Sequence, residues 1–201
     1  SRGLGDVYKR QVLCTVPLTV LDKINFSPAL SSEKQTAMNG GFRYAPATRI
    51  YIQFNNRFWE NESLNGWGNT DLPEEIWQPS WDMTGNTGVL MSYLRWSAAE
   101  DMDTLNQDER NNAVLNRWEN IFEGTINNFD KGVSKSWVLD EWSKGAWASP
   151  TTSQNETLNE SIAQTEGRIH FAGEHASNDR GWMQGALFSG LRAATEIKNA
   201  N

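Results

Sequence analysis

The sequence predicts a mixed fold of the α/β class, in which a sheet and helices form an α+β layer. Three stretches, residues 47–59, 88–96 and 135–142, have the composition or the apolar alternation of strands. Residues 106–122 repeat apolar side chains at helical spacing. The segment 167–197 then combines a strand pattern, a turn and an apolar helix. Strands and helices in this order indicate layers packed around a core.

The beginning of the chain predicts little regular structure. Residues 1–11 have no usable period, and we interpret them as a non-native or artefactual segment left by cloning or assembly. The apolar run from Val12 to Leu18, interrupted by Pro17, predicts a buried strand that leaves its sheet at the proline. Because this strand has no partner before it, we expect the sequence to be a fragment of a longer protein.

The central region predicts the strands and one clear helix. Residues 47–59 alternate Ile50, Ile52 and Phe54 with polar neighbours, which is typical of a half-buried strand. The helix predicted over 106–122 would present one face made of Ala113, Val114, Arg117, Trp118, Ile121 and Phe122. Gly124 lies where a C-terminal cap is expected. The polar stretch 149–165 has no period and predicts a surface loop or linker.

The last segment predicts a strand, a turn and a buried helix. Residues 168–173 alternate apolar and polar side chains and end in a glycine. The helix would bury one face made of Met183, Ala186, Leu187, Gly190, Leu191, Ala194 and Ile197. Gly185 and Gly190 each cost about 1 kcal/mol of helix stability relative to alanine. We therefore expect a neighbouring backbone or a ligand to approach these glycines closely.

Composition excludes several classes of partner. A net charge of −7 and the absence of a Lys/Arg cluster argue against nucleic acid. The single cysteine, Cys14, excludes an internal disulfide and a cysteine-rich metal site, and we expect no metal. No apolar run is long enough to span a bilayer, so we expect no membrane partner and a soluble protein, cytoplasmic or exported. A homo-oligomer is compatible with the sequence.

The turn before the last helix has the chemistry of a ligand site. A helix N-terminus presents unpaired N–H groups and a partial positive charge, to which anions and carbonyl oxygens bind. Glu174 follows the strand directly, where an acidic residue commonly accepts hydrogen bonds from sugar hydroxyls. The alternative is that Glu174 and the helix start simply cap one another.

The same segment carries a specific resemblance. The stretch RIHFAGEHASNDRGWMQGALFSGLRAATEI resembles the C-terminal FAD-binding signature of the flavin amine oxidase family, which includes monoamine, polyamine and L-amino-acid oxidases. Residues 12–30, 47–59 and 137–147 resemble other segments of that family in the same order. The resemblance implies a partial Rossmann-like FAD-binding domain from residues 12–27 and 161–201. It implies a substrate-binding domain from residues 28–160.

The resemblance also implies roles for single residues. The residues expected to contact FAD are Gly173, Glu174, Gly181, Trp182, Met183 and Ala186. Trp147 and Trp182 match the two aromatic side chains that guide the amine to the flavin, although both tryptophans could instead be core residues. Arg49 stands where many relatives have a water-holding lysine, its alternative role being a surface ion pair. Ala146 stands where some relatives have a flavin-linking cysteine, which implies non-covalent FAD.

The implied activity is FAD-dependent oxidation of a primary amine or L-amino acid to an imine, which water converts to a carbonyl compound and ammonia. The substrates would be that small amine or amino acid and dioxygen, which becomes hydrogen peroxide. The general pattern favours an L-amino-acid oxidase, with a monoamine or polyamine oxidase as the alternative. An alternative of another class is a non-catalytic binding domain that uses Trp59, Trp67, Trp77, Trp81 and Trp96.

One expected motif is missing from the sequence. Dinucleotide-binding units carry Gly-x-Gly-x-x-Gly after a strand. The nearest match, residues 66–71, ends in Asp71 and follows polar residues, so it predicts a loop. We therefore expect the dinucleotide-binding half to be absent from this sequence and the isolated fragment to be inactive.

Overall fold

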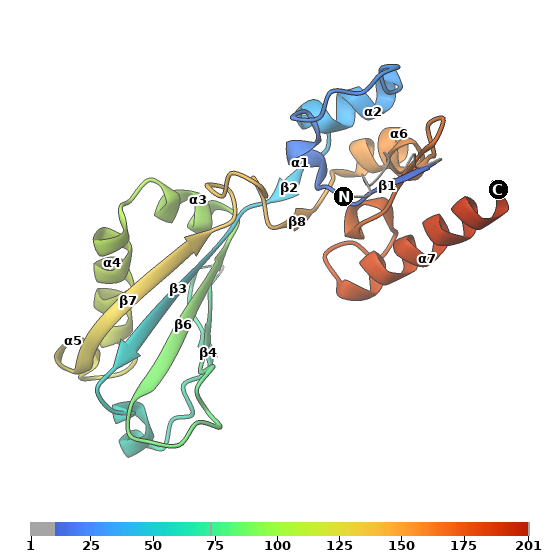
Figure 1. Ribbon diagram of the computed structural model, residues 1–201. Helices are drawn as coiled ribbons and strands as arrows, with labels where there is room; N and C mark the ends of the chain where they lie inside the picture. The colour runs from blue at the N-terminus through green and yellow to red at the C-terminus, as the bar shows by residue number, and fades with distance from the viewer. Residues whose placement is uncertain (1–10, 73, 201) are drawn as a thin grey trace, which may run out of the picture. The chain divides into compact units, whose positions relative to one another are not determined.

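The computed structural model describes residues 11–72 and 74–200, and these form two compact units (Figure 1). The first unit combines residues 11–44 with residues 147–200, and the second lies between them in the chain. The chain passes between the units at β2 (Tyr44–Ala45) and β8 (Trp147–Ala148). The predicted segment 1–11 lies, apart from its last residue, outside the described residues.

The second unit is built on a five-stranded antiparallel sheet in the order β4-β5-β6-β3-β7. Its strands are β3 (Ala47–Phe54), β4 (Gly68–Asn69), β5 (Glu74–Trp77), β6 (Gly88–Arg95) and β7 (Phe129–Ser136). The strands predicted over 47–59 and 88–96 are confirmed, although the first ends at Phe54 and η2 (Phe58–Glu62) follows it. Ile50, Ile52 and Phe54 are fully buried, as the alternation predicts.

Helices cover one face of this sheet (Figure 1). They are α3 (Ser97–Asp103), α4 (Gln107–Glu119) and α5 (Thr125–Asn128). Asn106 and Glu109 form a reciprocal capping box that begins α4, and Val114, Leu115 and Trp118 are buried against the sheet. The prediction was wrong at the C-terminal end of the helix, because α4 ends at Glu119 and the predicted face residue Ile121 is exposed. Gly124, with φ +93°, caps the start of α5 and not the end of α4.

The third predicted strand was misplaced along the chain. Residues 129–136 form β7, and residues 137–142 form bends and turns instead of a strand. Polar side chains stabilise this reversal: Asp140 accepts a hydrogen bond from the Trp142 N–H over 3.0 Å, and Ser136 Oγ accepts one from the Leu139 N–H over 3.1 Å. Such side-chain to backbone bonds compete with a sheet ladder and end the strand.

The first unit joins the two ends of the chain. Strand β1 (Val12–Cys14) pairs in parallel with β9 (Ile169–Phe171). Around them lie α1 (Leu18–Leu21), α2 (Ser32–Thr36), η1 (Ala37–Gly41), α6 (Thr152–Ala163), η3 (Glu174–Ala176) and α7 (Met183–Asn199). The strand predicted over residues 12–18 forms only at Val12–Cys14, and its predicted burial was wrong, because Val12 and Leu13 are exposed. Pro17 is the N-cap residue of α1. Proline suits a helix start because it has no N–H to leave unpaired.

Residues 149–165 are mostly a helix and not the predicted loop. Thr151 and Gln154 form a capping box at the start of α6, and Leu158 and Ile162 are its buried residues. These two positions, four apart, and the partly buried Ala163 are the apolar residues of α6 that pack against the core, so the hydrophobic period was too weak to identify the helix. The Thr-x-x-Gln capping pattern could have identified the start of this helix in spite of its polar composition.

The face of helix α7 that packs against its own unit is opposite to the face that the sequence predicts to be buried. Gly185, Ser189 and Ala193 are buried, whereas Met183, Leu187 and Leu191 are 80%, 72% and 69% exposed. An added Cβ on Gly185 would overlap the Asp179 carbonyl oxygen, which confirms the expected close approach of a backbone. No such approach exists at Gly190, where an added Cβ would meet no described atom within 4 Å. Small residues at intervals of four let the preceding loop lie against the helix.

The division into two units differs from the predicted division into domains. Contacts group residues 28–44 and 147–160 with the chain ends. The predicted domain boundaries at residues 28 and 160 rest on the family resemblance and stay a prediction. Within the described ranges, no helix combines the length and the apolar character needed to cross a membrane.

Candidate active site

Trp147 and the turn before α7 lie against each other in the first unit. Gly181 has φ +75°, and a Cβ added to it would lie 3.1 Å from Cδ1 of the Trp147 indole. Both the backbone angle and the ring beside it therefore favour glycine at this position. Because Trp182 is the next residue, the structure brings together the chain segments that carry the two predicted aromatic residues. Trp147 is half-buried and Trp182 is 70% exposed.

Glu174 connects the same two segments. One carboxylate oxygen, Oε1, accepts a hydrogen bond from the Ala148 N–H over 2.9 Å. The other, Oε2, accepts one from the Gly181 N–H over 2.8 Å. Gly181 lies before the N-cap residue, Trp182, so this bond does not satisfy an N–H group of the helix itself. Contact between Glu174 and FAD stays a prediction.

Gly173 and His175 shape the turn that holds Glu174. Gly173 has φ +135°, and an added Cβ would overlap the imidazole ring of His175. The Gly173 N–H donates a hydrogen bond to Ser189 Oγ over 2.9 Å, which ties the turn to α7. Burial, with smaller effects from Arg180 and Lys34, lowers the pKa of His175 to about 4. The imidazole is therefore neutral at neutral pH.

The start of α7 has the character expected of a flavin-contacting helix end. Its N-cap residue, Trp182, makes no side-chain capping bond, and the first turn contains no acidic residue. Trp182 and Met183 are exposed, and Ala186 on the next turn is half-buried. An uncapped helix start with a partial positive charge suits a carbonyl oxygen or developing negative charge. The residues present therefore fit the flavin that the sequence predicts.

A pocket of about 430 Å³ lies beside Trp147. It is lined by residues 147–152 together with Asn155 and Arg180. Arg180 is fixed there, since it donates hydrogen bonds to Asn155 Oδ1 over 2.9 Å and to Asn159 Oδ1. Burial lowers the pKa of Arg180 from its ordinary value. Arg180 was not among the site residues predicted from the sequence. Its position directly before the predicted site residue Gly181 could have identified it.

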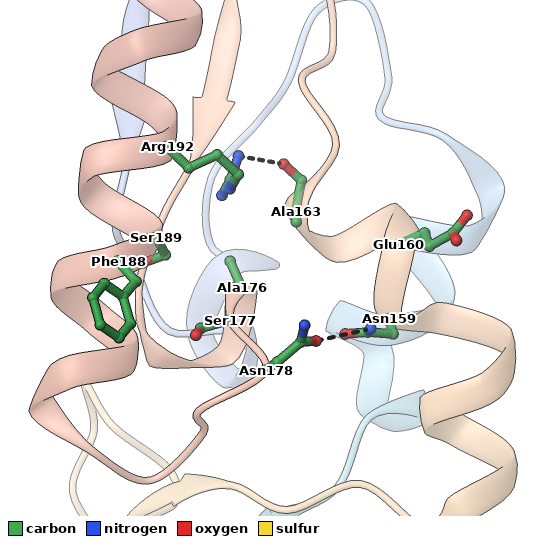
Figure 2. Close-up of a pocket in the computed structure, with 9 residues that line it drawn as sticks. All are labelled: Asn159, Glu160, Ala163, Ala176, Ser177, Asn178, Phe188, Ser189 and Arg192. Carbon is green, nitrogen blue, oxygen red and sulfur yellow. Dashed lines mark hydrogen bonds between the residues drawn. The ribbon is translucent and has the colours of Figure 1, made fainter.

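A second pocket, of about 290 Å³, lies between α6, η3 and α7 (Figure 2). Arg192 projects toward it but donates hydrogen bonds to the carbonyl oxygens of Ala163 and Phe171, over 3.1 and 2.6 Å. Ser189 at its wall accepts the Gly173 N–H. These polar groups hold elements of the first unit together, and none of the predicted site residues lines this pocket.

Arg49 belongs to the second unit. It stands on β3 between Tyr93 of β6 and Lys135 of β7, its register partners. The guanidinium carbon lies 4.7 Å from the centre of the Tyr93 ring. Among residues 11–72 and 74–200, no group accepts a hydrogen bond from its buried Nε. The same residues provide no carboxylate that pairs with it, whereas the neighbouring Lys135 pairs with Asp140. The predicted surface ion pair of Arg49 is therefore not formed among them.

The tryptophans of the alternative binding-domain hypothesis are distributed between core and surface. Trp59 is buried in the core of the second unit. Trp67 and Trp77 are exposed and stack, with ring centres 5.6 Å apart and an interplanar angle of 29°. Trp81 and Trp96 are exposed as well.

Comparison with known proteins relates this arrangement to enzymes. The family model described as flavin containing amine oxidoreductase matches residues 6–198. The L-amino-acid oxidase of Siganus canaliculatus is 33% identical over 97% of this chain and 38% of its own length. The putative L-amino-acid oxidase YobN of Bacillus subtilis is 34% identical over 92% of this chain and 40% of its own length.

Solved structures show the same fold. A putrescine oxidase mutant superposes with a TM-score of 0.84 at 18% identity, covering 95% of this chain and 43% of its own. Cyclohexylamine oxidase from Brevibacterium oxydans gives a TM-score of 0.80 at 19% identity, with the same two coverages. The predicted mixed α/β class is confirmed. The chain spans about two fifths of the length of the curated relatives it matches, in agreement with the prediction of a fragment.

Proposed function

Because the chain belongs to the family of flavin-containing amine oxidoreductases, we propose that the protein oxidises an L-amino acid with FAD and dioxygen. The substrate loses a hydride from its α-carbon and a proton from its nitrogen to become an imine. Water then converts the imine to a carbonyl compound and ammonia. Dioxygen accepts the two electrons and two protons that the substrate has lost and leaves as hydrogen peroxide. The choice of an L-amino acid over another amine is supported by relatives named L-amino-acid oxidase.

The cofactor would be held largely by the first unit. We assign FAD contacts to Gly173 and Glu174, at the turn after β9, and to the start of α7, namely Gly181, Trp182, Met183 and Ala186. When bound, FAD supplies the two-electron oxidant for the substrate carbon–hydrogen bond. The α7 N–H groups would stabilise negative charge next to them. In this proposal residues 12–27 and 161–201 contribute to the FAD-binding domain and residues 28–160 to the substrate-binding domain.

The observation that carries the proposal is the contact between Trp147 and the Gly181–Trp182 turn beside an uncapped helix start. Two indoles from adjacent segments can hold a small neutral amine by its apolar body and exclude water from it. Orientation of this kind supplies much of the rate enhancement when little acid–base chemistry is needed. Trp147 and Trp182 are therefore the residues to which we assign substrate positioning.

Arg49 is proposed to hold a water molecule for the reaction. Its Nε is a buried donor without a partner among the described residues, so a bound water would satisfy it. A guanidinium stays protonated and can orient water, but it does not serve as an adjustable base.

Attachment of FAD is proposed to be non-covalent. Ala146 has no nucleophile, and Cys14 lies buried on β1. Denaturation with acid should therefore release all the flavin into the supernatant. Flavin that stays with the precipitated protein would contradict this assignment.

The function is tested by expressing the full-length protein and measuring flavin absorbance and peroxide release with L-amino acids, D-amino acids, putrescine and cyclohexylamine. We expect yellow protein and turnover of L-amino acids. Turnover of the diamine alone would support a polyamine oxidase. Folded protein without flavin would contradict the enzyme assignment and favour the non-catalytic binding domain.

The aromatic pair is tested by Trp182→Ala, with Trp81→Ala as the matched control. Both tryptophans are about equally exposed, but Trp81 lies in the second unit. We expect Trp182→Ala to reduce kcat/KM at least tenfold with little loss of folded protein, and Trp81→Ala to leave both nearly unchanged. Equal loss of activity in the two variants would contradict the role of Trp182.

A further inference from the structure

We propose that Arg95 is a specificity-determining residue that binds the side-chain carboxylate of the substrate, so that the preferred substrates are L-amino acids with an acidic side chain. The inference rests on the proposed function, because it concerns the same reaction. It is carried by a group of charged and aromatic side chains on the five-stranded sheet, namely Arg49, Glu75, Trp77, Tyr93 and Arg95.

These side chains share the open face of the sheet, which is the face opposite the helices (Figure 1). Successive side chains of a strand point to opposite faces. On β3, β5 and β6 the residues in the core shared with the helices have even numbers, among them Ile50, Ile76 and Leu94. The odd-numbered residues of the group therefore belong to the open face. Tyr93 lies at its centre, since Arg49 and Glu75 are its register partners on the two neighbouring strands.

The group around Tyr93 carries an uncompensated positive charge. The guanidinium carbons of Arg49 and Arg95 lie 4.7 and 5.4 Å from the centre of the Tyr93 ring. Within residues 11–72 and 74–200, Glu75 is the one carboxylate that pairs with either of them. Two cations and one anion leave one positive charge, in a chain whose net charge is −7. An anion is therefore the ligand that complements this group.

Glu75 holds Arg95 in place without using all of its donors. Glu75 Oε1 accepts a hydrogen bond from Nη2 of Arg95 over 2.6 Å, and Oε2 accepts one from the Trp77 indole N–H over 3.0 Å. In the described part of the chain, no acceptor takes a hydrogen bond from Nε or Nη1 of Arg95. These N–H groups are open to a ligand, and a guanidinium is well suited to bind a carboxylate.

The anion is assigned to the substrate side chain for a chemical reason. An α-carboxylate is bonded to the carbon that is oxidised, so it stays with that carbon, whereas a side-chain carboxylate can reach a separate surface of the substrate-binding domain. Arg95 lies at the end of the sheet from which the chain continues into Trp147. It is paired in register with Ala47, and the Ala146 N–H donates to the Ala45 carbonyl oxygen over 2.9 Å.

The test compares L-glutamate with L-glutamine, which has nearly the same size but no charge on its side chain. We expect the full-length protein to have a kcat/KM for L-glutamate that is about tenfold higher or more, because a hydrogen bond to a charged group contributes roughly that much to binding. Arg95→Met keeps an unbranched side chain without the charge, and it should reduce this ratio about tenfold or more.

Lys135→Met is the matched control. Lys135 is the register partner of Arg49 on β7 and is a cation of the same sheet, but it pairs with Asp140. Its substitution should leave the ratio of the two kcat/KM values unchanged. If Lys135→Met reduced the ratio as much as Arg95→Met, the effect would come from the general charge of the sheet, and the assignment to Arg95 would be overturned.

Two kinetic outcomes separate this inference from the proposed function. A ratio near one in wild-type protein that oxidises L-amino acids would overturn the inference alone. An equal loss of kcat/KM for both substrates in folded Arg95→Met protein would also overturn it, since that loss would reflect a role common to all L-amino acids. Protein that contains no flavin and releases no peroxide with any L-amino acid would contradict the proposed function.

A binding measurement decides the inference without turnover. Full-length protein labelled with 5-fluorotryptophan is titrated with L-glutamate or L-glutamine in the absence of dioxygen, and Trp77→Phe assigns the Trp77 resonance in the ¹⁹F NMR spectrum. Trp77 reports on Arg95 because both donate to Glu75. We expect L-glutamate to shift this resonance to saturation, and L-glutamine to need a concentration about tenfold higher or more. No shift, the same shift with both amino acids, or a shift that persists in Arg95→Met would overturn the inference.

Discussion

Gly173 is a residue at which a single methyl group should damage the turn after β9. Its φ of +135° is unfavourable for alanine, and the new Cβ would overlap the His175 ring. We expect Gly173→Ala to lower the free energy of unfolding by about 2 kcal/mol or more. Urea denaturation followed by circular dichroism measures the change.

Gly190→Ala is the control for this substitution. Gly190 lies in helix α7 with open space around its Cα, so alanine should raise the free energy of unfolding by about 0.5 to 1 kcal/mol. Destabilisation by both substitutions to the same extent would mean that the contact with His175 does not determine the effect.

His175 should make the protein less stable in mild acid. Its pKa is about 4 in the folded protein, whereas an exposed histidine titrates near 6.5. The unfolded chain therefore binds a proton at His175 that the folded protein excludes, and the free energy of unfolding should fall as the pH drops from about 6.5 to 4. His175→Phe, which cannot titrate, should show a weaker dependence in that range. Identical pH dependence in urea denaturation of the two proteins would contradict this prediction.

The candidate site was only partly predictable from single residues. Gly173, Glu174, Gly181 and Trp182 lie within the ten residues 173–182, and their types indicated a turn with a ligand-binding helix start. The partners of Glu174 were not predictable, because they are backbone N–H groups that every residue except proline carries. Only the folded chain shows which of them approach the carboxylate.

At the scale of elements, the ion pair between α4 and β5 should be essential to the second unit. Arg117 of α4 donates two hydrogen bonds, of 2.8 and 3.0 Å, to the buried carboxylate of Glu74. Arg117→Met would leave that charge without its cation, so the free energy of unfolding should fall by about 3 kcal/mol, as measured by urea denaturation.

The neighbouring pair gives the comparison. Arg95 and Glu75 are only partly buried, and Arg95→Met should cost no more than about 1 kcal/mol. If the two substitutions cost the same, burial of Glu74 would not be the cause.

The sequence predicted the buried face of an element correctly where only one face could pack against the core. It predicted the wrong face where two faces of the same element could do so. Strand β3 alternates clearly, since Ile50, Ile52 and Phe54 all belong to the core that it shares with the helices. Helix α7 carries an apolar stripe and a small-residue stripe, and hydrophobicity alone favoured the wrong one as the face against its own unit. Steric fit to the 177–181 loop decides the packing, and periodicity contains no information about that loop.

At the scale of the whole molecule, the second unit should fold by itself. Its apolar core lies within residues 50–129, and its sheet pairs only strands of that unit. A protein of residues 45–146 should therefore give a cooperative urea transition and a circular dichroism spectrum with strand and helix signals. A non-cooperative transition would show that this unit needs the other.

The parallel pairing of β1 with β9 has a consequence for how the chain is made. During synthesis Val12 leaves the ribosome before the second unit, residues 45–146, whereas its register partner Ile169 leaves after that unit. Domains generally fold as units while synthesis proceeds from the N-terminus. Residues 45–146 can thus fold while β1 is still unpaired. A nascent chain arrested before residue 169 would contain a folded second unit and an incomplete first unit.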